Sequence, residues 1–406
     1  MKSLWYSPTL RSIVIYGAAG LGFAGANLIL ARVLPTQEYG LFTLVIALTN
    51  LSHAMAPMGV DGVVNRRHLE AGPSLLKRTL VAGLITALIG VTIAGLAYEI
   101  DTPLLLLVFA ATVGGGAMMV AAAQFQSEQR YGLSLALTQS PNIVLVVAAL
   151  AVVWTGIREA QLPLVIESFG FVLAGVIGWW MLFGERASKP HRETGFAWSE
   201  ALSIAGVNAA GLILVQLDRL IIPHVLTLHD LATFGVLAAI AGSLFRVLAL
   251  GVGYTLLPRL REASTIIERR RLIAHEIKLA LAIIVVGSLV IWFLTPWIER
   301  SFLAGKYHLT GSLLLATLFS GVAKIMNSLT RATVSALATP GELSTLNWLG
   351  WVSVVVAVLA GTWGARWGLT GLIYGVGLGW FMRGITGSYL TLRHLKLPES
   401  IQATAR

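Results

Sequence analysis

Residues 80–97 read LVAGLITALIGVTIAGLA, an apolar run without a single charged residue. A membrane-spanning α-helix needs about 20 mostly apolar residues, and the run reaches that length with its flanking residues Thr79 and Tyr98. Comparable stretches recur about twelve times along the chain, separated by short charged loops. Because no soluble core could bury so many apolar segments, the sequence predicts an all-α integral membrane protein.

The composition agrees with this prediction, since only 12% of the 406 residues are charged while 56% are hydrophobic and 42 are glycine. Such a chain has too few polar residues to cover a surface that faces water. An even number of spans places both termini on the same side of the membrane. We expect the twelve helices near 12–34, 41–65, 79–98, 103–126, 134–155, 161–184, 200–224, 231–257, 274–296, 309–331, 343–363 and 368–391.

The distribution of basic residues indicates which side holds the termini, because cytoplasmic loops are enriched in Lys and Arg. The loops opposite to the termini contain only Arg158, Arg300, Lys306 and Arg366, apart from Arg32 at a helix end. Both termini are therefore expected in the cytoplasm. The segments on the terminal side carry Lys2, Arg11, Arg66, Arg67, Lys77, Arg78, Arg130, Arg186, Lys189, Arg192, the cluster 259–271, Arg331, Arg393, Lys396 and Arg406.

The net charge of +10 is thus mainly a topology signal. The run Arg269–Arg271 lies between two spans and has no interleaved aromatic residues, so attraction to anionic lipid headgroups explains it better than a nucleic-acid partner. The N-terminal segment is not read as a signal peptide, although Ala24-Gly25-Ala26 resembles a cleavage site, because the apolar pattern continues to Leu34.

The chain also matches itself. Residues 59–71 align without gaps to residues 251–263, and Gly, Val, Arg, Glu and Ala coincide in the two segments. Tyr39-Gly40 and Phe234-Gly235 occupy similar places upstream. Chance similarity of two basic loop edges is the alternative. The repeat predicts an N-terminal six-helix bundle at 1–184, a cytoplasmic linker at 185–199 and a C-terminal bundle at 200–406, related by a pseudo-two-fold axis along the membrane normal.

The segment 30–42, which reads LARVLPTQEYGLF, followed by Gly59-Val60-Asp61 and Arg66, strongly resembles the N-terminal signature of polysaccharide flippases of the O-antigen type. These flippases belong to the multidrug/oligosaccharidyl-lipid/polysaccharide (MOP) exporter superfamily. Residues 216–219 and 233–235 resemble the corresponding signature of the second half. The resemblance covers essentially the whole chain, least clearly in the helices near 79–184 and 274–296.

The resemblance implies two six-helix bundles around a central cavity and alternating access. It implies as cargo a polyprenyl diphosphate-linked oligosaccharide, moved from the inner to the outer leaflet of a bacterial or archaeal cytoplasmic membrane for surface polysaccharide such as lipopolysaccharide. Proteins of polysaccharide assembly are implied as partners alongside the lipid bilayer. No cofactor is expected. Without an ATP site, coupling would come from a Na⁺ or H⁺ gradient or the membrane potential, or transport would run downhill.

Ionisable side chains within spans mark the expected substrate site, because they are costly there and face a cavity or a partner. Arg246, Lys324 and Arg383 each lie about 14–15 residues from the outer end of their helix, which places all three about 20 Å deep. Guanidinium and ammonium groups form charge-assisted bonds with phosphate oxygens. These three cations are therefore the first candidates for holding the diphosphate, with snorkelling to headgroups as the alternative for Arg383.

Five further residues are candidates. Arg32 belongs to the family-like run, with an interface anchor as the alternative, and Asp61 lies near the inner end of the second helix. Asp218 and Arg219 are neighbours about 100° apart on a helix, so one of them is expected to line the cavity. In related flippases an acidic group on the seventh helix contributes to a sodium site, which the position of Asp218 resembles. Asn347 would be its co-ligand, although it lies deeper than Asp218.

Two other functions compete with the flippase. A cation-coupled multidrug exporter could have the same fold, but such carriers favour acidic and aromatic cavities. A membrane-embedded polymerase or glycosyltransferase generally needs a large outer loop, and every outer loop here is short. The chain has no cysteine and shows no P-loop, metal-ligand spacing or nucleophile–base pair, so an enzyme is not expected. Gly371, Gly375 and Gly379 recur every four residues, which predicts a closely packed helix face.

Overall fold

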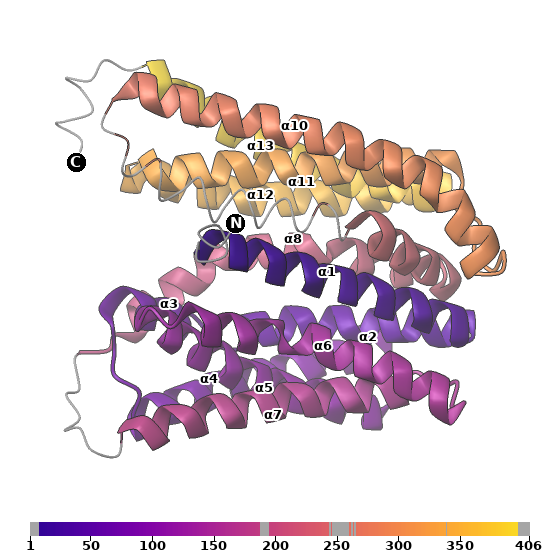
Figure 1. Ribbon diagram of the computed structural model, residues 1–406, viewed down its shortest axis with the longest axis horizontal. Helices are drawn as coiled ribbons and strands as arrows, with labels where there is room; N and C mark the ends of the chain where they lie inside the picture. The colour runs from indigo at the N-terminus through magenta and orange to yellow at the C-terminus, as the bar shows by residue number, and fades with distance from the viewer. Residues whose placement is uncertain are drawn as a thin grey trace, which may run out of the picture. The chain divides into compact units, whose positions relative to one another are not determined.

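The computed structural model describes residues 8–186, 195–242, 265–337 and 339–396, together with the single residues 245, 260 and 263 (Figure 1). Within these ranges the chain forms helices and no strand. The helices are α1 (Pro8–Val33), α2 (Thr36–Met55), α3 (Val60–Arg67), α4 (Pro73–Tyr98), α5 (Thr102–Ser127), α6 (Tyr131–Thr155), α7 (Gln161–Arg186), α8 (Trp198–Val225), the segment Leu228–Gly242, α10 (Ile266–Trp297), α11 (Gly311–Leu337), α12 (Pro340–Gly364) and α13 (Gly368–Lys396).

The spans expected from hydropathy coincide with helix, except that the span near 41–65 is divided into α2 and α3 by a turn at residues 56–59. The span near 231–257 is described continuously only as far as residue 242. Eight stretches of the described residues are long and apolar enough to cross a membrane, and one of them, Gly341–Leu395, contains both α12 and α13. Helices α4 and α10 expose many apolar side chains, including Leu88 at 58% and Phe293 at 75%. The all-α membrane fold is confirmed.

Turn chemistry explains several helix boundaries. Pro73 and Pro103 lie in the first turns of α4 and α5, where the missing N–H has no intrahelical partner to lose. Gly156 ends α6 in the left-handed region at φ 72°. Thr339 begins α12 with a capping box, because its side chain accepts a bond from the Glu342 N–H while the Glu342 carboxylate accepts one from the Thr339 N–H.

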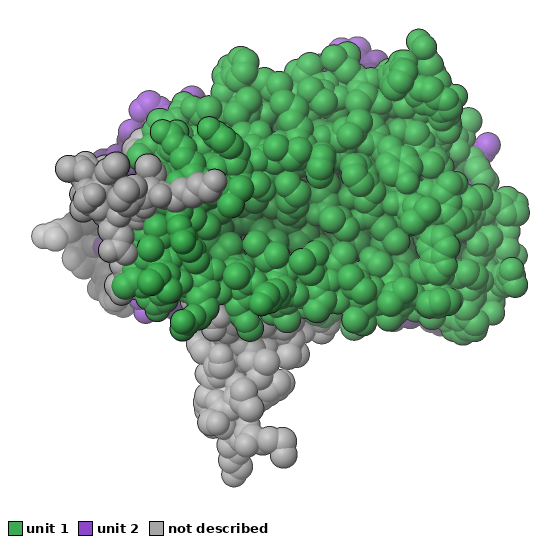
Figure 2. Space-filling view, turned by 90° about the horizontal axis from the view of Figure 1, so that it is seen from above, with its two compact units in different colours: residues 1–24, 224–406 green, residues 25–223 purple. Residues whose placement is uncertain are grey.

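The chain divides into two compact units, one of residues 25–223 and one of residues 224–406 with the first 24 residues (Figure 2). In the 25–223 unit, α5 is the central helix, packing against α2, α3, α4, α6 and α7. A Gly114-Gly115-Gly116 run makes this possible: a Cβ at Gly114 would lie 2.6 Å from the Val172 Cα of α7. The predicted linker at 185–199 stays a prediction, because most of it lies outside the described residues.

In the 224–406 unit, α12 and α13 form an antiparallel helical hairpin, and they stay in close contact at successive turns. A Cβ at Gly371 would approach the Gly364 carbonyl oxygen to 2.2 Å, and one at Gly375 would approach the Ala360 oxygen equally closely. Gly379 meets the Ala357 Cβ in the same way, at 2.5 Å. The close packing predicted for this glycine stripe is therefore confirmed, and α12 is the helix that it contacts.

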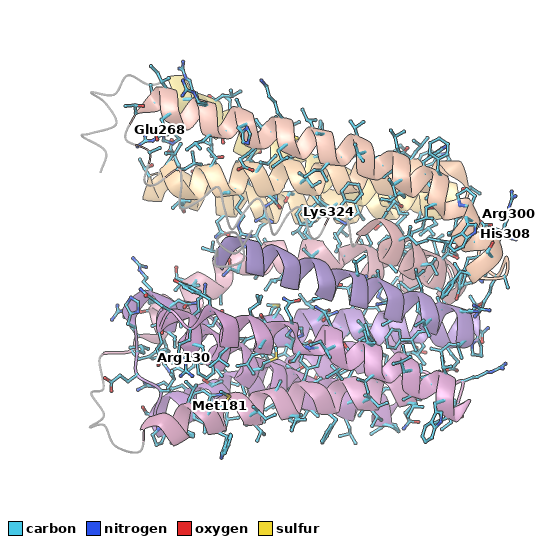
Figure 3. The ribbon with its side chains drawn as sticks, in the orientation of Figure 1. Arg130, Met181, Glu268, Arg300, His308 and Lys324 are labelled. Atoms are coloured by element: carbon cyan, nitrogen blue, oxygen red, sulfur yellow. The ribbon has the colours of Figure 1, made fainter. Side chains whose placement is uncertain are left out.

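Helix α11 packs on another side of α13 and runs parallel to it. Gly377 of α13 lies against Phe319, Gly384 against Met326 and Gly387 against Thr330, so contacting residues advance together along the two helices. Figure 3 shows Glu268 at one end of this unit, Arg300 and His308 at the other end, and Lys324 between them. The register and this view together place Lys324 in the middle of α11.

Candidate functional site: cations of α11 and α13

Lys324 and Arg383 lie at the same level of the 224–406 unit. The register that pairs Met326 with Gly384 brings Lys324 beside Trp380, and the Lys324 Nζ lies 5.8 Å from the centre of the Trp380 ring. Arg383, one turn further along α13, is only 7% exposed. The two cations thus lie at a similar level along α11 and α13, and their common depth in the membrane stays a prediction.

Arg331 joins them, since it is the charged group that acts electrostatically on Arg383. Arg331 and Lys324 are both on α11, seven residues and about two helical turns apart, so they lie along one face of the helix. Within the described part of the chain, no carboxylate forms an ion pair with Arg383. A buried guanidinium beside a like charge is unfavourable unless an anion compensates for it. The arrangement is therefore suited to binding a multiply charged anion.

Arg246 lies outside the described residues, but its neighbour Phe245 is described. Phe245 is 3% exposed and packs against α11, where a Cβ at Gly321 would lie 2.3 Å from its ring. Gly321 precedes Lys324 by less than one turn. The Phe245 side chain therefore contacts α11 less than one turn from Lys324, and the role of Arg246 stays a prediction.

The other predicted site residues lie elsewhere. Arg32 is exposed in the last turn of α1, and Asp61 is half-buried in the first turn of α3. On α8, Asp218 is 2% exposed, while the Arg219 Nη1 donates to the Gln216 Oε1 at 2.8 Å. Asn347 is half-buried in α12 and belongs to the other unit, so its pairing with Asp218 stays a prediction. No group of three metal-ligating side chains occurs among the described residues.

A contact between α3 and α8 explains the family-like Gly59–Arg67 segment. Helices α2 and α3 are bent by 41° at a break where Gly59 has φ 83°, and a Cβ at Gly59 would lie 1.9 Å from the Ala201 carbonyl oxygen. At the end of α3, Arg66 and Arg67 both form ion pairs with Glu200, at 3.5 and 2.5 Å. Gly59, Arg66 and Arg67 of the signature therefore hold α3 against the first turn of α8.

Sequence reasoning missed Arg331 and Glu200 as functional candidates. Arg331 was counted only as a loop charge, although its seven-residue spacing from Lys324 was a usable signal. Glu200 had no such signal, because its partners lie far away in the sequence and only the fold brings them together.

Solved structures show what class of protein this architecture defines. A multidrug resistance MATE family transporter of the MOP superfamily, in its inward-facing conformation, matches with a TM-score of 0.64 and 14% identity over 97% of this chain and 96% of that chain. The lipid II flippase MurJ, in an inward closed conformation, matches with a TM-score of 0.63 and 12% identity over 98% and 89%. At these identities the likeness shows the fold alone, which this chain shares with that MATE transporter and with MurJ.

The family follows from a sequence model. The model of polysaccharide biosynthesis proteins matches residues 9–264, which is more than half of the chain. The chain therefore belongs to the polysaccharide biosynthesis protein family, which confirms the resemblance found in the signature segments. No curated protein matches the chain. Its neighbours of known structure are transporters and flippases rather than enzymes.

Proposed function

We propose that this protein is a flippase that translocates a lipid diphosphate-linked oligosaccharide across the cytoplasmic membrane by alternating access, for the synthesis of surface polysaccharide of the O-antigen or lipopolysaccharide type. The family supports the polysaccharide pathway, and the fold shared with a lipid II flippase supports a lipid-linked cargo. The protein would bind and move its substrate without making or breaking a bond.

The observation that carries this proposal is the group of cations on α11 and α13. A diphosphate provides several oxygens and more than one negative charge, which matches guanidinium and ammonium groups spread over two helical turns. Arg383 holds a fixed position because it is buried, while Lys324 and Arg331 lie along the neighbouring helix. Arg246 completes the proposed diphosphate site, and the polyprenyl tail would stay in lipid.

Lys324, Arg331 and Arg383 also argue against the multidrug exporter as the second candidate. Cationic drugs would be repelled by Lys324, Arg331 and Arg383, and no carboxylate among the described residues neutralises Arg383. The proposed roles of Arg32, Arg219 and Asp61 are secondary contacts to the sugar or headgroup. Asp218 and Asn347 are retained as proposed ligands of a coupling ion.

Substitution of Arg383 tests the proposal. In Arg383→Ala, each lost charge-assisted hydrogen bond should weaken binding by about 1.5–3 kcal/mol, which is about tenfold to over a hundredfold in affinity. The measurement is flipping of a lipid diphosphate-linked oligosaccharide in proteoliposomes, together with surface polysaccharide and protein abundance in cells. Arg300→Ala is the matched control, because Arg300 is exposed at the end of the unit away from Lys324 (Figure 3).

Arg383→Lys should keep part of the activity, since it preserves the charge but loses the planar donor fork. Normal flipping by a fully expressed Arg383→Ala protein would contradict the proposal. So would equal losses in Arg383→Ala and Arg300→Ala, because a general effect of net charge would then explain both variants.

A further inference from the structure

Glu167 is a buried carboxyl group of the 25–223 unit to which the proposed diphosphate site assigns no role. It lies in the second turn of α7 and is 6% exposed. Its Oε2 accepts no hydrogen bond from any described residue. Burying a polar group without a partner is costly, and burying an ionised one is far more costly. An energetic penalty of this kind inside a membrane protein indicates a functional group.

The surroundings of Glu167 follow from the packing of α7. Helices α5 and α6 pack against α7, and α2 also contacts it. Gly170 of α7 lies against Val144 of α6, and Gly175 lies against Gly114 of α5. Phe171, one turn after Glu167 and on the same side of α7, stacks on His53 of α2 with ring centres 4.7 Å apart. Glu167 therefore faces the interior of this bundle.

Titratable groups around Glu167 are few. Helix α5 carries none, and α6 carries only Tyr131 at its first residue. Helix α2 carries Glu38 and Tyr39 at its start and His53 near its end. The remaining titratable groups of α7, Glu185 and Arg186, lie at its far end. No lysine or arginine of α2, α5 or α6 is therefore available to balance a Glu167 carboxylate.

His53 is the titratable group of α2 that contacts α7, through Phe171. Its Nδ1 lies 2.9 Å from the Thr49 carbonyl oxygen, and because a carbonyl only accepts, Nδ1 carries a proton. Uptake of a further proton by the ring would then occur at Nε2. His53 is only partly buried, whereas Glu167 is almost fully buried. His53 thus contacts Phe171, which lies one helical turn from the buried Glu167 on α7.

We propose that Glu167 is a proton-binding site that couples the transport cycle to the proton gradient, with His53 assisting proton exchange. The inference rests on the proposed transport function and names the proton as its coupling ion, in place of an ion held by Asp218 and Asn347. While α7 is packed against α5 and α6, the carboxyl group holds its proton because no cation compensates the carboxylate. A conformation that hydrates this region lets the proton leave to water, and the ionised group then resists repacking until a proton returns.

A proton suits this site better than a metal ion. Sodium or a divalent cation needs several oxygen ligands, whereas the described residues contain no group of three acidic or histidine side chains that could hold a metal ion. One carboxyl group is sufficient for reversible proton binding.

The first test measures proton binding without any substrate, so that it stays independent of the proposed cargo. Infrared difference spectra of the purified protein in lipid, recorded between high and low pH, should contain the carbonyl stretch of a protonated carboxylic acid. Glu167→Gln should remove this band, and Glu167→Asp should shift it. Ser168→Ala is the matched control, because Ser168 is the next residue, equally buried at 6% and not titratable in this range.

Glu167→Gln should fold normally, since glutamine reproduces the shape of the neutral acid. Loss of the band in Glu167→Gln with retention in Ser168→Ala supports the site. A Glu167 band that stays constant over the whole pH range in which the protein is folded would overturn the proposal, because the group would then be permanently neutral. A band that responds to sodium at constant pH would also overturn it, because the site would then bind a metal cation.

The second test connects the site to transport. Flipping in proteoliposomes should accelerate when a pH gradient is imposed, and Glu167→Gln should lose this acceleration while Ser168→Ala keeps it. His53→Gln should slow the response without abolishing it. Flipping by the unmodified protein that ignores the pH gradient would overturn the coupling. If neither the unmodified protein nor any variant flips the substrate while the infrared band is intact, the proposed cargo would be contradicted and proton binding would remain established.

Discussion

Arg331 and Arg383 are two like charges that act electrostatically on each other within the 224–406 unit. In the proposed flippase this repulsion would favour a diphosphate, because an internal carboxylate would compete with the substrate for the same cations. At these residues, the stability of the protein without substrate and its affinity for an anion therefore oppose each other. An anion bound to both guanidinium groups would remove this repulsion.

Arg331→Glu tests this opposition directly. The new carboxylate should pair with Arg383 and replace repulsion by attraction, so the thermal stability of the protein in detergent should rise, by about 1 kcal/mol for a partly exposed pair. Flipping should fall sharply because the substrate loses one cation and meets one anion. Arg393→Glu is the control at an exposed arginine that pairs with Glu342, and it should lower stability. Lower stability in Arg331→Glu would contradict the electrostatic account.

Gly59 shows how one residue satisfies two constraints. Its φ of 83° is unfavourable for any residue with a Cβ, and the Ala201 carbonyl oxygen occupies the place where that Cβ would be. Gly156 has a similar φ of 72° but nothing within 4 Å of its Cβ position. Comparison of the single variants Gly59→Ala and Gly156→Ala therefore separates the conformational penalty from the clash with α8.

Gly156→Ala should lower the free energy of unfolding by about 1–2 kcal/mol, the usual penalty of the left-handed region. Gly59→Ala should lower it by clearly more, since α3 must also withdraw from the backbone of α8. Thermal unfolding of the purified proteins measures both effects. Equal losses in the two variants would show that the contact between α3 and α8 contributes nothing.

At the scale of helices, the α12–α13 hairpin depends on backbone contact through its glycine stripe. Gly375→Ala places a methyl group where the Ala360 carbonyl oxygen lies only 2.2 Å away, so the helices must separate. We expect a loss of about 1–3 kcal/mol, the usual range for overpacking. Gly341→Ala is the control in α12, because nothing lies within 4 Å of its Cβ position. Thermal stability that is equal in the two variants would contradict the proposed close packing.

Hydropathy and spacing predicted these helices and the packed glycine stripe, because both depend on local sequence alone. The same reasoning placed Lys324 and Arg383 at one depth, since depth follows from the helix rise. It could not find Arg331 as the neighbour of Arg383, because that contact depends on the parallel register of α11 and α13. It likewise could not identify the helices that pack around Glu167.

At the scale of the whole molecule, orientation in the membrane stays a prediction that rests on the lopsided Lys and Arg distribution. The repeat also stays a prediction, because most of residues 251–263 lies outside the described ranges. Within the 224–406 unit, Glu268 and the following arginines lie at the end opposite to Arg300 and His308 (Figure 3). The orientation model places the Glu268 end in the cytoplasm.

The absence of cysteine allows a direct test of orientation, because every introduced thiol is the only one in the protein. His308→Cys and Ile157→Cys should react with a membrane-impermeant maleimide in intact cells, since both lie in exposed segments of the expected outer side. Ile267→Cys, with 68% of its side chain exposed at the Glu268 end, and Lys77→Cys should react only after permeabilisation. Labelling of Ile267→Cys in intact cells would show the opposite orientation. The cluster of basic residues beside it would then face outward, against the positive-inside rule.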